Sequence, residues 1–403
     1  MPFYPLLLSV CRLSALFFGG IIVLYHKGGR NMDKSKVRIP QRFREHPIFN
    51  ELICGTNFGF MAKRGYYDRP EVKKQPELMR KAGINWTSLN MMYCQDRYYS
   101  DKVYLDFEYS NSEREISETV KRLHDNGIRV MLKSNLTLLD GGWMGLVSFP
   151  GKGALSQIQG VEVDYWGKWF RSFTEAQKYF ADFAERAGVD ALMLGAEYFG
   201  TEGQNEYWEK VIDAVRGLYS NPITYEFTYR SRQTYDLEWI KKLDFLSYSY
   251  YPPACEPNVP ELDDTYNPGA RDIPSKTAEE MAEYLAPRKK RISLISERFD
   301  NMPVAFTEFG TRSAHGCIMQ PWNFLWETYY DGEEQANFME AAFRTFWELP
   351  EWMGFLWWKW DETQNRPQYH LDPAGDMGFT IQGKPAEEVM RRWLKKASER
   401  KLS

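Results

Sequence analysis

Short apolar runs alternate with amphipathic stretches along the chain from about residue 53 onward. A short apolar run between polar positions predicts a buried strand, whereas apolar residues at the helical period predict one face of a helix. The strand pattern occurs over residues 54–60, 84–89, 129–132, 189–194, 223–229, 243–250, 304–307 and 354–358. Polar loops and then amphipathic helical stretches follow these runs.

Capping residues mark where several of the intervening helices begin and end. Ser112 followed by Glu115 forms a capping box, and Gly127 stops the same helix. Gly188 stops the next helix in the same manner. Further helices are predicted over residues 173–188, 333–347 and 385–394.

Strands that alternate with helices imply parallel pairing and right-handed crossovers. Eight such units fit a closed barrel better than an open sheet, and no G-x-G-x-x-G motif follows the first strand as a dinucleotide-binding fold would require. The predicted fold class is therefore α/β, a single (β/α)8 TIM barrel that occupies residues 38–398.

The composition narrows the classes of protein to consider. The chain has 403 residues, of which 43% are hydrophobic and 26% are charged, so it is long enough to bury a large core and too apolar to be disordered. Its 51 Lys and Arg residues against 55 Asp and Glu residues leave no basic excess, which argues against a nucleic-acid partner.

Cysteine and histidine are sparse and widely spaced. The five cysteines form no CxxC pair, which argues against a zinc ribbon and against a disulfide scaffold. The five histidines do not fall at the spacings typical of metal ligands. We therefore expect neither a metal site nor a cofactor.

Aromatic residues are unusually abundant, with 14 Trp, 25 Tyr and 25 Phe. Flat aromatic faces suit a partly polar partner such as the C–H face of a sugar ring. The alternative is an aromatic-rich core, and composition alone does not separate the two.

Residues 6–25 are strongly apolar but do not have the order of a secretory signal. Arg12 interrupts the run, the other positive charges follow it, and no small-residue cleavage site is present. Residues 27–31 back-translate into a purine-rich stretch of the kind that precedes a start codon. We expect Met32 to be the true start, residues 1–31 to be untranslated and the protein to be cytoplasmic. The alternative is a leader or retained anchor, which would make the protein secreted or membrane-anchored.

Two predicted strands end in a glutamate. Glu197 ends the fourth strand and Glu308 ends the seventh, and these strands lie on opposite sides of an eight-stranded barrel. Active sites of such barrels lie at the carboxyl ends of the strands. Two carboxyl groups about 5–5.5 Å apart supply the nucleophile and the acid of a retaining glycosidase. For either residue alone, the alternative is a helix cap or an ion pair with arginine.

Three tryptophans, Trp357, Trp358 and Trp360, end the eighth predicted strand. Strand alternation places Trp358 and Trp360 on one face and Trp357 on the other. We expect one of these indole rings to form the base of a sugar-binding subsite. We expect at least one of the other tryptophans to pack against the outer helices.

Other residues that follow predicted strands are candidate substrate contacts: Asn90, Gln95, Lys133, Trp143, Tyr250 and Trp322. Tyr250 or its neighbour Tyr251 is expected to donate a phenol hydrogen bond to Glu308. Lys133 is a costly charge to bring into a barrel mouth unless the two glutamates are there, and its alternative is a solvated loop position. For the remaining candidates the alternative is ordinary loop packing.

Several short motifs occur in a fixed order along almost the whole globular part of the chain. They are GTNFG at 55–59, RVMLK at 129–133, WMG at 143–145, GAE at 195–197, TEFGTRS at 307–313, QPW at 320–322, WWKW at 357–360 and GKPA at 383–386. Each motif is weak alone, but the ordered set resembles glycoside hydrolase family 113, the β-1,4-mannanases of the large clan of (β/α)8 retaining glycosidases.

This resemblance implies that Glu197 is the acid/base and Glu308 the nucleophile of a metal-independent hydrolase. The chain also departs from the pattern. Ala196 stands where the wider clan usually has Asn, so a hydrogen bond to the sugar 2-hydroxyl must come from elsewhere. The third strand ends in Lys133-Ser134-Asn135 where Lys-Pro-His is expected. These departures bear on sugar specificity more than on reaction type.

We therefore expect a glycosidase that acts on a β-linked oligo- or polysaccharide, most specifically an endo-β-1,4-mannanase of polysaccharide degradation. One alternative is another specificity, such as β-mannosidase or β-glucanase. Another is a non-catalytic carbohydrate-binding barrel, against which the presence of both glutamates argues. A membrane contact is expected only if residues 6–25 are retained as an anchor.

Overall fold

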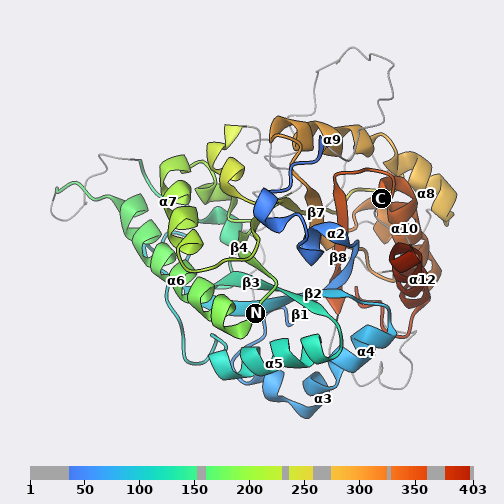
Figure 1. The fold of residues 1–403 in the computed structure, drawn as a ribbon, viewed down its shortest axis with the longest axis horizontal. Coiled ribbons are helices and arrows are strands. Elements are labelled where there is room, and N and C mark those ends of the chain that lie inside the picture. Colours follow the sequence, from blue (N-terminus) through green and yellow to red (C-terminus); the bar gives the residue numbers. More distant parts are fainter. Residues whose placement is uncertain are drawn as a thin grey trace.

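The computed structural model describes residues 36–151, 160–228, 236–256, 274–324, 328–360 and 377–399, and the apolar segment over residues 6–25 lies outside these. Eight parallel strands close into a barrel in sequence order, and helices surround it (Figure 1). The strands are β1 Ile53–Phe58, β2 Trp86–Gln95, β3 Arg129–Leu138, β4 Ala191–Ala196, β5 Ile223–Thr228, β6 Leu246–Ser249, β7 Val304–Phe309 and β8 Trp352–Trp360. The predicted single (β/α)8 barrel is confirmed.

The barrel is wrapped by helices that differ widely in length. The α-helices are α2 Pro47–Asn50, α3 Pro70–Lys73, α4 Gln75–Lys81, α5 Glu113–Asp125, α6 Tyr165–Ala187, α7 Asn205–Arg216, α8 Ala278–Leu285, α9 Arg288–Arg298, α10 Gly332–Phe346 and α12 Pro385–Glu399. The short 3-10 turns are η2 Gln41–Phe43, η3 Tyr66–Asp68, η4 Met144–Leu146, η5 Phe199–Thr201, η7 Glu238–Lys242 and η9 Cys317–Met319. Among the helices of the described residues, none is long and apolar enough to cross a membrane.

The predicted helix signals act as expected. Ser112 accepts a hydrogen bond from the backbone of Glu115, whose side chain accepts one from the Ser112 backbone, so α5 begins with a complete capping box. Gly188 ends α6 in the left-handed conformation at φ 70°, which glycine adopts without steric cost.

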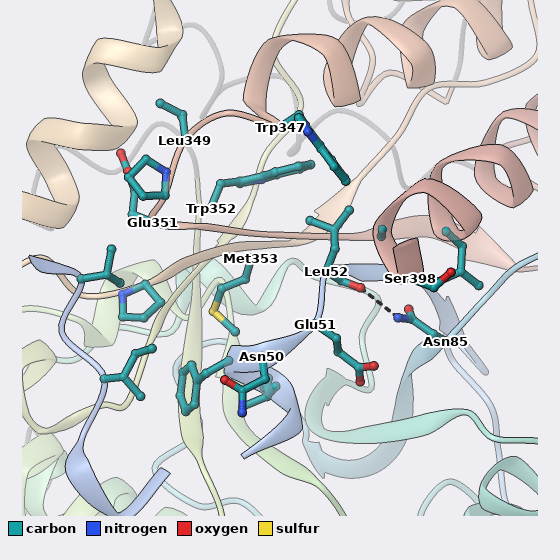
Figure 2. Close-up of a pocket in the computed structure, with 18 residues that line it drawn as sticks. Asn50, Glu51, Leu52, Asn85, Trp347, Leu349, Glu351, Trp352, Met353 and Ser398 are labelled. Carbon is teal, nitrogen blue, oxygen red and sulfur yellow. Dashed lines mark hydrogen bonds between the residues drawn. The ribbon is translucent and has the colours of Figure 1, made fainter. Parts of the chain in front are cut away.

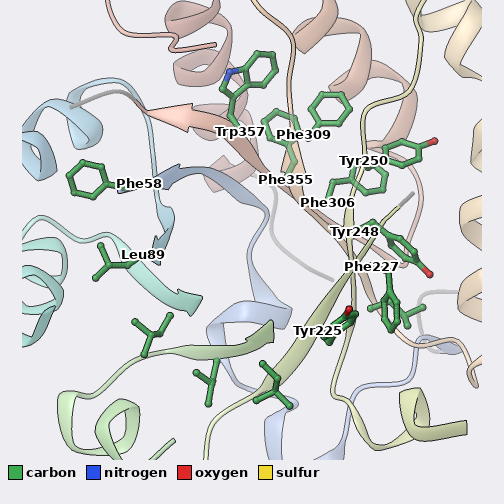
Figure 3. Close-up of a cluster of buried hydrophobic side chains, with 14 of the residues drawn as sticks. Phe58, Leu89, Tyr225, Phe227, Tyr248, Tyr250, Phe306, Phe309, Phe355 and Trp357 are labelled. Atoms are coloured by element: carbon green, nitrogen blue, oxygen red, sulfur yellow. The ribbon is translucent and has the colours of Figure 1, made fainter. Parts of the chain in front are cut away.

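Two layers of buried side chains hold the barrel together. Trp86, Met131, Met193, Phe245 and Leu356 belong to a cluster that fills the barrel interior. A larger cluster packs the outward faces of the strands against the helices (Figure 3). The labelled residues of that outer layer are Phe58, Leu89, Tyr225, Phe227, Tyr248, Tyr250, Phe306, Phe309, Phe355 and Trp357.

Barrel closure depends on a glycine in β8. Gly354 has φ 112°, and a Cβ atom there would lie 2.2 Å from the carbonyl oxygen of Ile53 in β1. A larger residue would therefore push β8 away from β1, the pair of strands that closes the barrel.

Strands β2 and β3 run to Gln95 and Leu138, well past the predicted ends at residues 89 and 132. Their upper halves contain polar residues such as Asn90 and Lys133, which pair with each other in register. A prediction that relies on hydrophobicity does not expect polar residues inside a buried strand. These polar residues occur here because the interior of the barrel is polar at the carboxyl ends of the strands.

Candidate active site

Charged and phenolic side chains converge at the carboxyl ends of the strands. Lys133 comes from β3, Glu226 from β5 and Glu308 from β7, while Glu197 directly follows β4 and Tyr251 follows β6. In a (β/α)8 barrel this end carries the chemistry.

Lys133 bridges two carboxylates inside the barrel mouth. Its Nζ atom lies 2.9 Å from Oε1 of Glu226 and 2.5 Å from Oε1 of Glu308. The Lys133 side chain is only 2% exposed, so it is not the solvated loop charge considered as its alternative. Burial lowers the pKa of Lys133, but the charges of Glu226 and Glu308 outweigh burial and raise it overall.

Glu226 was not among the residues predicted from the sequence. It lies within a predicted strand and its side chain is fully buried. Burial and the charge of Glu308 raise its pKa, although Lys133 opposes the shift. A glutamate in the middle of a predicted buried strand was the available signal, because a buried acid requires a partner.

Both carboxylate oxygens of Glu308 have a donor. Lys133 binds Oε1, and the Tyr251 hydroxyl donates to Oε2 at 3.2 Å. A bulge turns this side chain inward: Ser247 pairs with Ala305 but Ser249 pairs with Glu308, so β7 has one extra residue. Without that residue, strand alternation would point Glu308 away from the mouth.

Glu197 stands at a strained turn after β4. Its φ is 59°, in the left-handed region that costs a residue with a side chain about 1 kcal/mol or more and that is concentrated at functional sites. The turn requires glycine at position 195, since a Cβ atom there would lie 2.2 Å from the Tyr198 ring. The Trp143 indole donates to Oε2 of Glu197 at 3.3 Å.

The two predicted catalytic glutamates differ in their electrostatic surroundings. Burial and the charge of Glu308 raise the pKa of Glu197, against smaller opposing effects of Ser249, Lys133 and Trp143. Glu308 instead pairs directly with a buried cation. A raised pKa suits Glu197 to the role of the acid, and direct contact with a cation suits Glu308 to the role of the nucleophile.

Tyr251 lies close enough to three carboxyl groups to be influenced by all of them. Burial and the charges of Glu308, Glu226 and Glu197 together hold its pKa well above the ordinary tyrosine value. The phenol therefore remains a neutral hydrogen-bond donor toward Glu308 at ordinary pH.

The other tyrosine considered for this bond, Tyr250, lies elsewhere, which corrects its assignment as a substrate-binding residue. Its ring is 1% exposed and stacks on Phe306 with centroids 4.4 Å apart, in the layer beneath the outer helices (Figure 3). Neighbouring strand residues point to opposite faces, so Tyr251 rather than Tyr250 reaches the mouth.

The tryptophans of β8 also face different sides from those predicted: Trp358 and Trp360 do not share a face. Trp358 is half-buried, and Lys133 Nζ lies 5.9 Å from the centre of its ring. Trp360 is buried and donates its indole N–H to Gln75 on α4 at 2.9 Å, so its prediction as a substrate contact is wrong.

A bulge is the cause of this separation. Thr56 pairs with Trp357 and Phe58 with Trp360, so β8 carries one more residue than β1 between these pairs. The extra residue turns Trp360 to the same outward side as Trp357. The Trp358–Lys359 peptide bond, which is cis, lies within this bulge.

Asn90 and Gln95 are both buried. The Asn90 side-chain N–H donates to the carbonyl oxygen of Phe58 at 3.1 Å, while its Oδ1 atom has no hydrogen-bond partner among the described residues, so its role as a substrate contact stays a prediction. The Gln95 side chain accepts from the Trp169 indole at 2.7 Å and donates to the Arg97 carbonyl oxygen at 2.7 Å. The Gln95 contacts correspond to the loop-packing alternative rather than to a substrate contact.

Trp322 is half-buried in the loop after η9, downstream of β7. Its role as a substrate contact stays a prediction, as does that of Trp143 and Trp358.

The carboxylates of the mouth are not arranged as metal ligands. The Lys133 ammonium stands between Glu226 and Glu308 and already supplies the positive charge that a cation would provide there. The chemistry that this arrangement supports is proton transfer and nucleophilic attack.

A separate pocket lies at the opposite end of the barrel (Figure 2). Its lining includes Leu52, Asn85, Pro303 and Glu351, each just before the start of a strand. That end of a (β/α)8 barrel serves stability, and the lining includes none of the mouth carboxylates. It is therefore not the candidate active site.

Comparison with protein-family models matches residues 56–384 to Glycoside Hydrolase Family 113. Among curated proteins, none matches the chain.

Solved structures of similar fold include β-mannanases of that family. A β-1,4-mannanase described in complex form has a TM-score of 0.70 at 22% identity, covering 86% of this chain and 99% of its own. A β-mannanase from Alicyclobacillus acidocaldarius has a TM-score of 0.71 at 22% identity, with 87% and 99% covered. A family 5 mannosidase from Rhizomucor miehei has a TM-score of 0.59 at 12% identity, with 87% and 94% covered. At these identities the likeness establishes the shared fold.

Proposed function

Since the chain belongs to glycoside hydrolase family 113, we propose that it cleaves β-1,4-mannosidic bonds in mannan or manno-oligosaccharides by a retaining double displacement. The observation that carries the mechanism is the pair formed by Glu197, whose environment raises its pKa, and Glu308, which forms an ion pair with Lys133.

In the first step, Glu308 attacks the anomeric carbon while protonated Glu197 gives its proton to the leaving oxygen. The bond to the leaving sugar breaks and a covalent glycosyl-enzyme forms on Glu308. Lys133 and Tyr251 keep the two Glu308 oxygens in position for the attack.

In the second step, Glu197 is ionised and takes a proton from water, which attacks the same anomeric carbon from the opposite face. Two inversions restore the original β configuration. Release of Glu308 as a carboxylate restores its ion pair with Lys133. The Trp358 ring, beside Lys133, supplies an apolar face on which the reacting sugar can stack.

Mannan is the substrate that the family and the fold neighbours' described activities favour. The alternative specificities are those of a β-mannosidase or a β-glucanase, since mannose and glucose differ only at C2. Ala196 is relevant here because it supplies no side-chain hydrogen bond to that position.

Product analysis by proton NMR tests the substrate and the stereochemistry together. We expect cleavage of mannohexaose with initial release of the β-anomer, and no cleavage of gluco- or galacto-oligosaccharides of equal length. Cleavage of another panel member would retain the mechanism and replace the substrate. Binding without cleavage of any member would favour the non-catalytic carbohydrate-binding barrel.

Substitution of the two glutamates tests their separate roles. Glu308→Ala should reduce turnover by at least about 10³-fold, and added azide should rescue it with an α-linked azide product, because azide replaces the nucleophile on its own face. Glu197→Ala with an activated aryl glycoside and azide should yield the β-linked product. The exposed Glu77→Ala is the control. More than a trace of unrescued activity in Glu308→Ala would falsify the assignment.

A further inference from the structure

A second cluster of titratable side chains lies outside the mouth, between the loop after β7 and the start of α10. His315 Nδ1 lies 3.0 Å from Oδ2 of Asp331 and 3.7 Å from Oε2 of Glu334. One ligand atom from each of the three residues lies within 4.8 Å of the others. His315 is in the loop, Asp331 is the N-cap of α10 and Glu334 lies in its first turn.

Glu334 adds a buried carboxyl group to this cluster. The residue is 2% exposed, and burial raises the pKa of its carboxyl group, against smaller opposing effects of the Gly316 and Ile318 backbone N–H groups and of His315. Among the described residues, His315 is the one cationic side chain within ion-pair distance of Glu334 or of Asp331. A buried carboxylate is costly unless a cation or a proton neutralises it.

The three side chains are held in place by their surroundings. Asp331 uses its second oxygen to accept from the Glu334 backbone N–H at 2.9 Å. The His315 ring stacks on Tyr329 with centroids 4.6 Å apart. The two backbone segments pair through an antiparallel bridge between Ala314 and Tyr330. Fixed contacts of this kind around the ligand residues orient them before a metal ion binds.

We propose that His315, Asp331 and Glu334 form a binding site for a divalent transition-metal ion, with Zn²⁺ as the representative. One imidazole nitrogen and two carboxylate oxygens at bond lengths of about 2.0–2.2 Å make three corners of a tetrahedron, and the observed separations are close to those its corners require. The sequence spacing did not predict this site because the fold, not the chain order, brings the three residues together.

The site would act as a structural clamp independent of the catalytic carboxyl groups. It ties the loop after β7, which also carries Trp322, to the first turn of α10. Because the His315 side chain is only 3% exposed, the ion would be taken up mainly as the chain folds.

Metal content and thermal unfolding of the full chain test the proposal. The protein is expressed with Zn²⁺ in the medium, dialysed with or without EDTA, and analysed by mass spectrometry of the metal. We expect about one Zn²⁺ per chain before EDTA treatment and a higher melting temperature in the Zn²⁺-loaded form. Asp331→Asn and Glu334→Gln should each weaken Zn²⁺ binding by at least about tenfold.

These variants and a control separate metal loss from unfolding. Asparagine caps a helix as well as aspartate does, so Asp331→Asn should remain folded by circular dichroism. His124→Gln removes a histidine that pairs with Asp190 but has no second carboxylate within ion-pair reach in the described part of the chain, and its Zn²⁺ content should equal that of the parent. The proposal is overturned if the parent binds no stoichiometric Zn²⁺, or if folded Asp331→Asn and Glu334→Gln bind it equally well.

Discussion

The ammonium group of Lys133 on β3 lies 2.5 Å from a carboxylate oxygen of Glu308 on β7, across the barrel mouth. The second oxygen of Glu308 is bound by the Tyr251 hydroxyl. This fixes the rotation of the carboxylate, and it places a buried positive charge beside the group that the proposed mechanism uses as the nucleophile.

Replacing Lys133 removes the cation that Glu226 and Glu308 share. For Lys133→Met we expect a loss of about 3–5 kcal/mol in the free energy of unfolding, because two buried carboxyl groups lose their shared partner. Turnover should fall as well, because Lys133 no longer holds one oxygen of Glu308 in position. Chemical denaturation and steady-state kinetics of the folded variant measure these effects. Unchanged turnover in folded Lys133→Met would show that Lys133 does not support the nucleophile.

Glu226 should tolerate glutamine better than alanine. Burial and the charge of Glu308 raise the pKa of Glu226, which favours its neutral form, and a glutamine oxygen can still accept from Lys133. Glu226→Gln should retain kcat within about tenfold, whereas Glu226→Ala should lose more because Lys133 is no longer held. Steady-state kinetics of the two variants decide the point. Equal losses in both would mean that a charged Glu226 is required.

Tyr251 and Tyr250 form a matched pair for testing the phenol bond. Tyr251→Phe removes a hydrogen bond to a charged group, so kcat/KM should fall by about 10–100-fold. Tyr250→Phe keeps the ring that stacks on Phe306 and should leave kcat/KM nearly unchanged. Melting curves check that both variants are folded. A greater loss of activity in Tyr250→Phe would contradict the assignment.

Trp143 should set the upper pH limit of activity. Its indole N–H bonds to Glu197 and lowers that group's pKa, so Trp143→Phe should raise the pKa of Glu197. Because the acid must be protonated to act, the basic limb of kcat/KM should move to higher pH, by about one unit or less. Trp239→Phe is the control, since its indole donates to a backbone carbonyl instead. A shift of the basic limb to lower pH in Trp143→Phe would contradict this role of Trp143.

Trp358 and Trp360 should give opposite results when truncated. Trp358→Ala removes a half-buried ring beside Lys133 and should raise KM with little change in stability. Trp360→Ala removes a buried side chain and its bond to Gln75, which should cost about 3–5 kcal/mol of stability. Kinetics of the folded fraction and denaturant titration measure the two effects. A substrate-binding defect confined to Trp360→Ala would reverse the assignment made here.

Much of the fold was predictable because its signals are local. The apolar runs located all eight strands, and Ser112, Glu115 and Gly188 marked helix ends through hydrogen bonds within a few residues. The ends of β2 and β3 were missed because the carboxyl-terminal halves of these strands contain buried polar side chains. Hydrophobicity alone assigns such polar residues to loops.

The candidate site was predictable only in part. Glu197 and Glu308 could be singled out because barrel topology brings the ends of the fourth and seventh strands to one mouth. Glu226 was overlooked because it lies in the middle of its strand and not at the end, and its partner Lys133 is 93 positions away.

The sequence by itself determined the alternation of strands and helices, and hence the closed barrel and the end at which its chemistry lies. Tertiary structure alone decided which side chains face the mouth. Alternation along a strand is a local rule, but an extra residue against a neighbouring strand reverses it, as at Glu308 and Trp360. Such a shift exists only in the pairing of two strands, so it becomes visible only when the barrel is closed.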